Sequence, residues 1–152
     1  WANLFAVNDR ESMVAAMERL QPYRSPRTTT VGILNNRADR QVRATQFADV
    51  AVRDLDFDRL VTFGAYEQIV TQRLIENGWP ANRIANLGEQ RKPTIEQMIE
   101  ELVYNNGTPH VLVVGFVNIH THQAEMMLDY FEHEAETVEP GAVPDSQMAV
   151  VA

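Results

Sequence analysis

A chain of 152 residues is long enough for one domain with its own core, and its 45% hydrophobic residues can fill that core. No apolar run approaches the ~20 residues that a membrane-spanning helix needs, and the lack of cysteine excludes disulfide and thiolate chemistry. The formal net charge of −8 argues against nucleic-acid binding, so a site for an anionic ligand would need a local group of arginines.

The beginning of the chain and its composition bear on its cellular setting. No signal peptide precedes the first strand candidate, which together with the lack of cysteine suits a cytoplasmic protein. The chain opens on Trp1, without an initiator methionine and directly in an apolar segment. We therefore expect it to be a piece of a longer protein.

Short β-branched segments alternate with helical patterns along the chain. Strands are expected at residues 3–7, 28–34, 60–63, 83–87 and 111–114. This alternation is typical of βα units, so we predict an α/β fold with three layers, in which a mostly parallel sheet of about five or six strands has helices on both faces. Residues 1–133 would form this domain. Residues 134–152 are rich in Glu, Pro and Gly and would form a tail, whose last residues could pair as an edge strand.

Helix starts and faces can be predicted from capping residues and apolar spacing. Asn8 with Glu11, and Thr94 with Gln97, fit capping boxes, and Thr121 can cap the last helix. The inner faces of two further helices are predicted from their spacing to be Ala44, Phe47, Ala48, Ala51 and Leu55, and Tyr66, Ile69, Val70 and Leu74.

The most polar loop follows the second strand. Arg37, Arg40 and Arg43 lie within seven residues there, next to a helix N-terminus that Asp39 could cap. One guanidinium group can donate to two oxygens of a phosphate or carboxylate at once, and a helix N-terminus adds N–H donors. The pattern favours an anion site. The alternative is a solvated helix start whose charges form ion pairs within the helix.

A second polar turn joins the fifth strand to the last helix. Asn118, His120 and His122 lie in it, after the strand is interrupted by Gly115, where the backbone must bend or approach another group. In open α/β sheets ligands bind at this carboxyl edge. The two histidines could share a zinc ion, but no third-ligand pattern accompanies them, so we expect no metal site. Hydrogen bonding or helix capping, and substrate contact or acid–base work, both remain open for them.

Nucleotide-binding loops of the familiar kinds are missing from the sequence. Neither a Gly-x-x-x-x-Gly-Lys-Ser/Thr loop nor a Gly-x-Gly-x-x-Gly motif occurs. A self-contained nucleotide hydrolase or a Rossmann dehydrogenase is therefore disfavoured.

Three segments carry a resemblance to a known family. Residues 3–12 (NLFAVNDRES), 35–48 (NNRADRQVRATQFA) and 114–120 (VGFVNIH) resemble, in order and at similar spacing, the C-terminal part of the ligase subunit of poly-γ-glutamate synthase, of the CapB or PgsB type. The first two segments are also similar, more faintly, to the C-terminal domain of Mur ligases. Val117 and Thr121 stand where the family tends to have glycines.

The resemblance implies an ATP-dependent amide ligase that polymerises glutamate through γ-amide bonds by way of an acyl phosphate. It implies that Arg37, Arg40 and Arg43 bind phosphate or carboxylate oxygens and that His120 is the catalytic candidate. The cleft would be lined by Asn8, Asn36, Asp39 and Asn118. ATP and Mg²⁺ would be held mainly by a central P-loop domain of the parent protein and not by this chain alone.

The same resemblance implies the partners. They are that P-loop domain, the membrane subunits of the synthase, and glutamate or poly-γ-glutamate, with the protein at the inner face of the membrane. Two other readings stay open: a non-catalytic Mur-ligase-like binding or assembly domain, and a flavodoxin-like module that binds a small anion.

Two spatial expectations follow for a shared site. If His120 and the loop from Arg37 to Arg43 share one site, they should lie within roughly 10 Å of each other; since adjacent parallel strands are ~4.8 Å apart, the strands that end at Leu34 and Val114 should be direct neighbours or separated by only one strand. Ile119 should be the buried anchor of its turn, with Asn118 and His120 held at the open edge.

Overall fold

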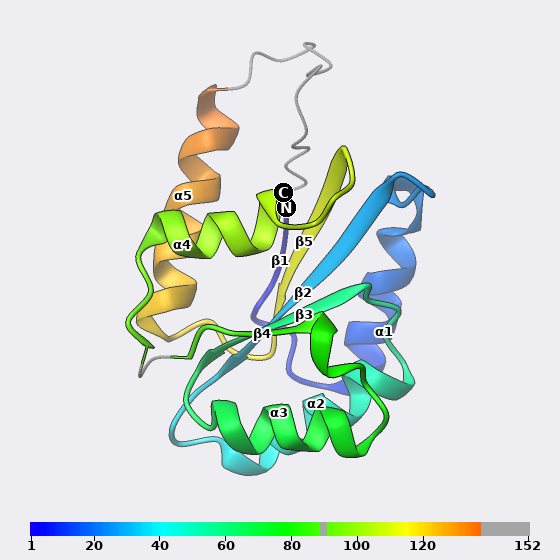
Figure 1. Ribbon diagram of the computed structural model, residues 1–152, viewed down its shortest axis with the longest axis vertical. Helices are drawn as coiled ribbons and strands as arrows, with labels where there is room; N and C mark the ends of the chain where they lie inside the picture. Colours follow the sequence, from blue (N-terminus) through cyan, green and yellow to red (C-terminus); the bar gives the residue numbers. More distant parts are fainter. Residues whose placement is uncertain (89–90, 138–152) are drawn as a thin grey trace.

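The computed structural model describes residues 1–88 and 91–137, and a parallel sheet lies at its centre (Figure 1). In this part of the chain the sheet has five strands in the order β1-β5-β2-β3-β4. All four strand pairings are parallel, so the predicted fold class is confirmed. The strands are β1 (Ala2–Leu4), β2 (Thr28–Asn36), β3 (Arg59–Gly64), β4 (Ile84–Asn86) and β5 (His110–Phe116).

Helices cover both faces of the sheet. Figure 1 shows α1, α2 and α3 on one side and α4 and α5 on the other. The helices are α1 (Arg10–Arg19), α2 (Gln41–Arg53), α3 (Glu67–Glu76), α4 (Ile95–Ile99) and α5 (His122–Thr137). The short helices are η1 (Gln21–Tyr23), η2 (Ala81–Arg83) and η4 (Glu100–Tyr104), a π-helical continuation of α4.

Two apolar cores follow from the alternation of side chains along the strands. Ile33 and Val113 point into the core under α4 and α5, whereas Leu34 and Val114 point into the core under α1, α2 and α3. Such a sheet is buried on both faces, which explains why residues 31–34 of β2 and 111–114 of β5 are apolar without alternation.

The predicted helix faces are confirmed except at Tyr66 and Ile69; Tyr66 is the N-cap residue of α3 and is only partly buried. All five apolar residues of the α2 stripe are buried, as are Val70 and Leu74 of α3. Ile69, predicted to face inward, is 44% exposed. That prediction was wrong because Val70 and Leu74 define the inner face of α3, and a residue next to Val70 is turned by about 100° around the helix.

Two of the four predicted caps are wrong. Asp9, not Asn8, caps α1, because its carboxylate accepts the backbone N–H of Ser12 at 2.8 Å. Asp39 does not cap α2, because its carboxylate accepts from Arg37 instead. Arg40 occupies the N-cap position of this helix, and its side chain provides no cap.

The other two caps are confirmed. Thr94 and Gln97 form the full capping box of α4. At the start of α5, Thr121 Oγ1 accepts the backbone N–H of Ala124 at 3.2 Å.

Two glycines permit close backbone contacts near the carboxyl edge. A Cβ at Gly115 would lie 2.4 Å from the ring of Phe5, which confirms the predicted close approach. Gly64 ends β3 with a φ of +74°, and a Cβ there would lie 2.0 Å from the carbonyl oxygen of Asn36.

The last helix extends further than its sequence pattern indicates. Helix α5 runs to Thr137 and so includes residues 134–137, the start of the predicted tail. The remaining tail, with its expected edge strand, lies outside the described residues. No helix within residues 1–88 and 91–137 is both long and apolar enough to cross a membrane.

Candidate functional site

The carboxyl ends of β2 and β5 form the centre of the candidate site. The two strands are direct neighbours, with Leu34 opposite Phe116, which confirms the expected adjacency. After β2 the chain passes to α2 on one face of the sheet, and after β5 it passes to α5 on the other face. Such a point, where neighbouring strands lead to opposite faces, is where ligands bind in open α/β sheets.

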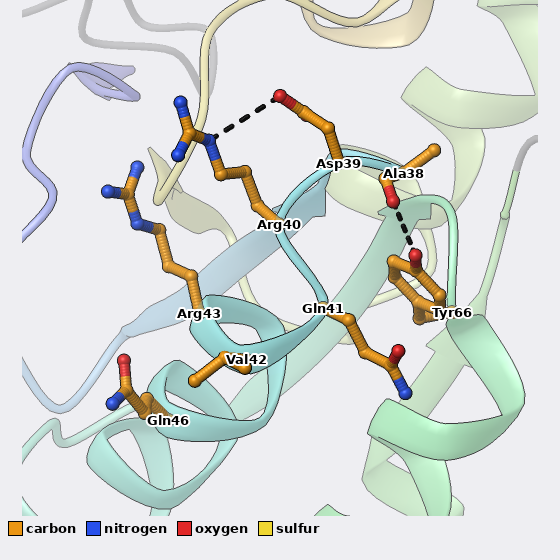
Figure 2. Close-up of a pocket in the computed structure, with 8 residues that line it drawn as sticks. All are labelled: Ala38, Asp39, Arg40, Gln41, Val42, Arg43, Gln46 and Tyr66. Carbon is orange, nitrogen blue, oxygen red and sulfur yellow. Dashed lines mark hydrogen bonds and ion pairs between the residues drawn. The ribbon is translucent and has the colours of Figure 1, made fainter.

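A hollow of about 480 Å³ lies at the N-terminus of α2. Figure 2 shows the guanidinium groups of Arg40 and Arg43 on one side of the first turn, and Gln41 and Tyr66 on the other. The lining residues are Ala38, Asp39, Arg40, Gln41, Val42, Arg43, Gln46 and Tyr66. The structure thus brings together two of the three predicted arginines in one hollow.

The N-terminus of α2 has donors to offer to a ligand. Its N-cap residue Arg40 makes no side-chain cap, and the first turn contains no acidic residue. Backbone N–H groups in the first turn of a helix have no partner within the helix. Together with the partial positive charge of the helix end, they favour an anion.

The third arginine is already paired. Arg37 forms a two-point ion pair with Asp39, with Nε–Oδ1 and Nη2–Oδ2 distances of 2.9 and 3.0 Å. Arg40 Nε lies 3.5 Å from the same carboxylate. Desolvation acts to raise the pKa of Asp39, but the hydrogen bond and charge of Arg37 outweigh it, so this pKa lies below its usual range. Asp39 is therefore an internal counter-ion and not the predicted helix cap.

A reciprocal pair of asparagines joins β2 to the β5–α5 loop (residues 117–121). Asn118 Nδ2 donates to the carbonyl oxygen of Asn35 at 2.9 Å, and Asn35 Nδ2 donates to the carbonyl oxygen of Asn118. Asn118 Oδ1 accepts from Arg43 Nη1 at 3.5 Å. Asn118 is 5% exposed whereas Ile119 is only partly buried, so the prediction that Ile119 anchors this turn was wrong.

The start of α5 is bonded to the ends of three strands. Thr121 Oγ1 donates to Asn35 Oδ1 at 2.8 Å, at the end of β2. Gln123 accepts the backbone N–H of Gly64 at 2.8 Å and donates to the carbonyl oxygen of Leu87, just after β4. Gln123 therefore holds the carboxyl edge in place.

Three residues of this region were not predicted as site residues. Gln123 carried no signal that could have identified it, because a glutamine early in a helix is usually solvated. Gln46 could have been found, since it follows Arg43 by three residues and shares its helix face. Tyr66, expected to be a core residue, lines the hollow and donates its hydroxyl to the carbonyl oxygen of Ala38.

The remaining predicted site residues differ in solvent exposure. Asn8 and His120 are exposed on the loops that follow β1 and β5. Asn36 is fully buried, and its amide donates to the carbonyl oxygen of Leu34 at 3.2 Å. His122 is the first residue of α5 and lines a different hollow, beside Lys92. In the described part of the chain no three His, Asp or Glu side chains are grouped so that they could hold a metal ion.

Val117 has an unusual backbone. Its φ is +90°, a region that β-branched residues rarely adopt, and it is buried. This is one of the two positions at which the family that the sequence resembles tends to have glycine. A glycine would adopt this conformation without strain.

Comparison with known proteins gave one family and one curated relative. Residues 1–134 match the family described as the poly-gamma-glutamate synthase CapB C-terminal domain. The chain is 25% identical over 120 residues to PGA synthase CapB of Bacillus subtilis (strain 168), an alignment that covers 79% of this chain and 29% of that protein. The chain thus spans less than a third of the length of this relative. No solved structure matched.

Proposed function

Since this chain belongs to the family of poly-gamma-glutamate synthase CapB C-terminal domains, we propose that it is the C-terminal domain of an ATP-dependent amide ligase that makes poly-γ-glutamate. The observation that carries the proposal is the uncapped N-terminus of α2, with Arg40 and Arg43 beside it, at the point where β2 and β5 lead to opposite faces of the sheet. Such a site suits the phosphate and carboxylate groups of this reaction.

The reaction would couple phosphoryl transfer to amide formation. ATP with Mg²⁺ would supply the phosphoryl group that activates a glutamate γ-carboxylate as an acyl phosphate. The amino group of the incoming glutamate would then attack the acyl carbon, so that a C–N bond forms, the C–O bond to phosphate breaks, inorganic phosphate leaves and the nitrogen gives up a proton to a base. We assign the holding of ATP and Mg²⁺ mainly to a P-loop domain of the parent protein, because this sequence contains no P-loop.

The residues of the hollow fit an anion better than a cation. Arg40, Arg43 and the first-turn N–H groups of α2 are donors only. Asp39 is the one carboxylate among the lining residues, and it is paired with Arg37. In the closed enzyme the arginines would neutralise phosphate or carboxylate oxygens, and such a charge-assisted bond is worth roughly 1.5–3 kcal/mol when partly desolvated.

Other residues and partners of the site are part of the proposal. His120 and Asn8 lie on loops at the same edge of the sheet and are proposed to face the substrate, with His120 as the acid–base candidate. The partners we propose are the P-loop domain of the parent, glutamate or the growing polymer, and membrane subunits that would bring the enzyme to the inner face of the membrane.

Substitution of Arg40 in the full-length parent tests the proposal. Arg40→Ala should lower the rate of glutamate incorporation at least tenfold, because one donor to a developing charge is commonly worth about 10²–10³ in rate. The free energy of unfolding should change by no more than ~0.5 kcal/mol, since Arg40 is a half-exposed surface residue. Arg53→Ala, at the other end of α2 and 63% exposed, is the matched control and should leave incorporation unchanged.

The same experiment separates the competing roles. Equal losses of stability and activity, or no loss of either, would contradict the anion site. Normal incorporation by Arg40→Ala, together with loss of the membrane subunits from the purified complex, would instead indicate the binding or assembly role.

A further inference from the structure

The three arginines of the site are not equivalent. Arg37 already spends two of its N–H groups on the carboxylate of Asp39. Arg43 is partly buried, and within the described residues its guanidinium bonds to one neighbour, Asn118 Oδ1. Four of its N–H groups therefore remain for a ligand, because a guanidinium has five and one is used by Asn118.

The amide of Asn118 can face Arg43 in one orientation only. Its Nδ2 is committed to the carbonyl oxygen of Asn35, and that carbonyl can accept but not donate. Oδ1 must then point the other way, toward Arg43. The whole residue is held by the return bond from Asn35 Nδ2 to its own carbonyl oxygen, and by its burial.

We propose that Asn118 is a positioning residue that acts through Arg43. It holds the Arg43 guanidinium against the β5–α5 loop, so that the remaining N–H groups face the hollow at the N-terminus of α2 in a fixed direction. This inference rests on the proposed anion-binding function. Its physical basis is that a long arginine side chain loses rotamer freedom on binding, and a partner that orders it beforehand reduces that loss.

The first measurement follows the Arg43 side chain without any ligand. In ¹⁵N relaxation of the 152-residue chain, the Arg43 Nε–Hε group should be ordered, whereas that of Arg53, which is 63% exposed and pairs with Asp49 through Nη2 alone, should be more mobile. Asn118→Ala should bring Arg43 to the mobility of Arg53. Asn106→Ala is the matched control: it removes another amide that donates to a backbone carbonyl, that of Leu102 at 2.8 Å, and should leave Arg43 ordered.

The second measurement is a titration with inorganic pyrophosphate. Arg43→Ala and Asn118→Ala should each weaken binding by about three- to tenfold, and the double variant should be no weaker than Arg43→Ala, because residues that act through one contact are not additive. Arg37→Ala should weaken binding less than Arg43→Ala does. Additive losses would mean that Asn118 acts on the fold in general, and would overturn the inference.

The two measurements distinguish failure of the inference from failure of the proposed function. If Arg43 in the unsubstituted chain is as mobile as Arg53, the positioning role is wrong, and this result does not require Asn118→Ala to fold. If Arg43 is ordered by Asn118 but Arg43→Ala binds pyrophosphate unchanged, the anion role itself is wrong and the contact serves stability alone.

Discussion

At the scale of single residues, the backbone conformation of Val117 leads to a prediction about stability. Its φ of +90° costs roughly 1–2 kcal/mol for a residue with a Cβ but nothing for glycine. We therefore expect Val117→Gly to be more stable than Val117→Ala by about 1 kcal/mol, in denaturant unfolding of the two variants. This reverses the usual order, in which glycine is the less stable by roughly 0.5–1 kcal/mol.

Val113 supplies the comparison for this prediction. It is as well buried as Val117 but lies within β5. There the alanine variant should be more stable than the glycine variant. If Val117→Ala proves more stable than Val117→Gly, the left-handed conformation at this position is excluded.

The error at Ile119 shows what apolarity alone cannot predict. The sequence places an isoleucine between two polar residues, which favours burial of the isoleucine. In the fold, Asn118 is buried because it satisfies a backbone carbonyl at the end of β2 and accepts from Arg43. A polarity pattern contains no information about such partners, which come from residues 83 and 75 positions away in the sequence.

At the scale of elements, an ion pair links α2 to α3. Arg73 donates to both carboxylate oxygens of Asp49, at 2.6 and 2.9 Å, and Asn77 donates to Oδ1. The hydrogen bond from Arg73 is the main cause that lowers the pKa of Asp49 from 3.8 to about 2. In the unfolded chain this carboxyl takes up a proton at a higher pH than in the folded chain.

The pair should therefore stabilise the fold above pH 3.8 and lose its effect as the pH falls toward 2. At pH 6, Asp49→Asn should reduce the free energy of unfolding by about 1 kcal/mol, less than the pKa difference alone implies, because Arg73 is partly solvated. The difference from the unsubstituted chain should shrink in urea unfolding at pH 3 and below. Asp129→Asn, an equal charge change at an exposed position of α5, is the control for the loss of one negative charge.

The helix caps show how far local sequence predicts the start of an element. Thr94 and Thr121 were predicted correctly because the hydroxyl oxygen of each accepts a backbone N–H that lies only three residues further along the chain. Asp39 was predicted wrongly because Arg37, two residues before it, binds the carboxylate more strongly than a backbone N–H does. Local rules thus succeed where no charged neighbour competes for the cap.

At the scale of the whole molecule, the alternation of strands and helices was enough to predict a parallel α/β sheet. It was not enough to predict the order of the strands. That β2 and β5 are neighbours, or have only one strand between them, was expected because His120 and the loop with Arg37, Arg40 and Arg43 had been assigned to one site, not because of any pattern in the strands. The place of β1 beside β5 follows from packing that no local signal encodes.

A prediction about activity also belongs to this scale. We expect the 152-residue chain alone not to hydrolyse ATP, because it contains no loop that cradles a triphosphate with magnesium in the P-loop manner. Phosphate release should equal that of a blank without protein, while the full-length parent serves as the positive control. Turnover by the isolated chain that Arg40→Ala abolishes would refute this expectation and place the nucleotide site within this domain.

The position of β5 between β1 and β2 also governs how the molecule is made. While the chain emerges from the ribosome, β2, β3 and β4 can pair with one another, but β1 has no neighbour until β5 arrives, since Ala2 pairs with Val114. Parallel pairing of strands so far apart in the sequence is slow, and the edges of β1 and β2 stay unpaired until β5 has been made. A nascent chain that stalls before Phe116 would therefore lack both the complete sheet and the loop that carries Asn118.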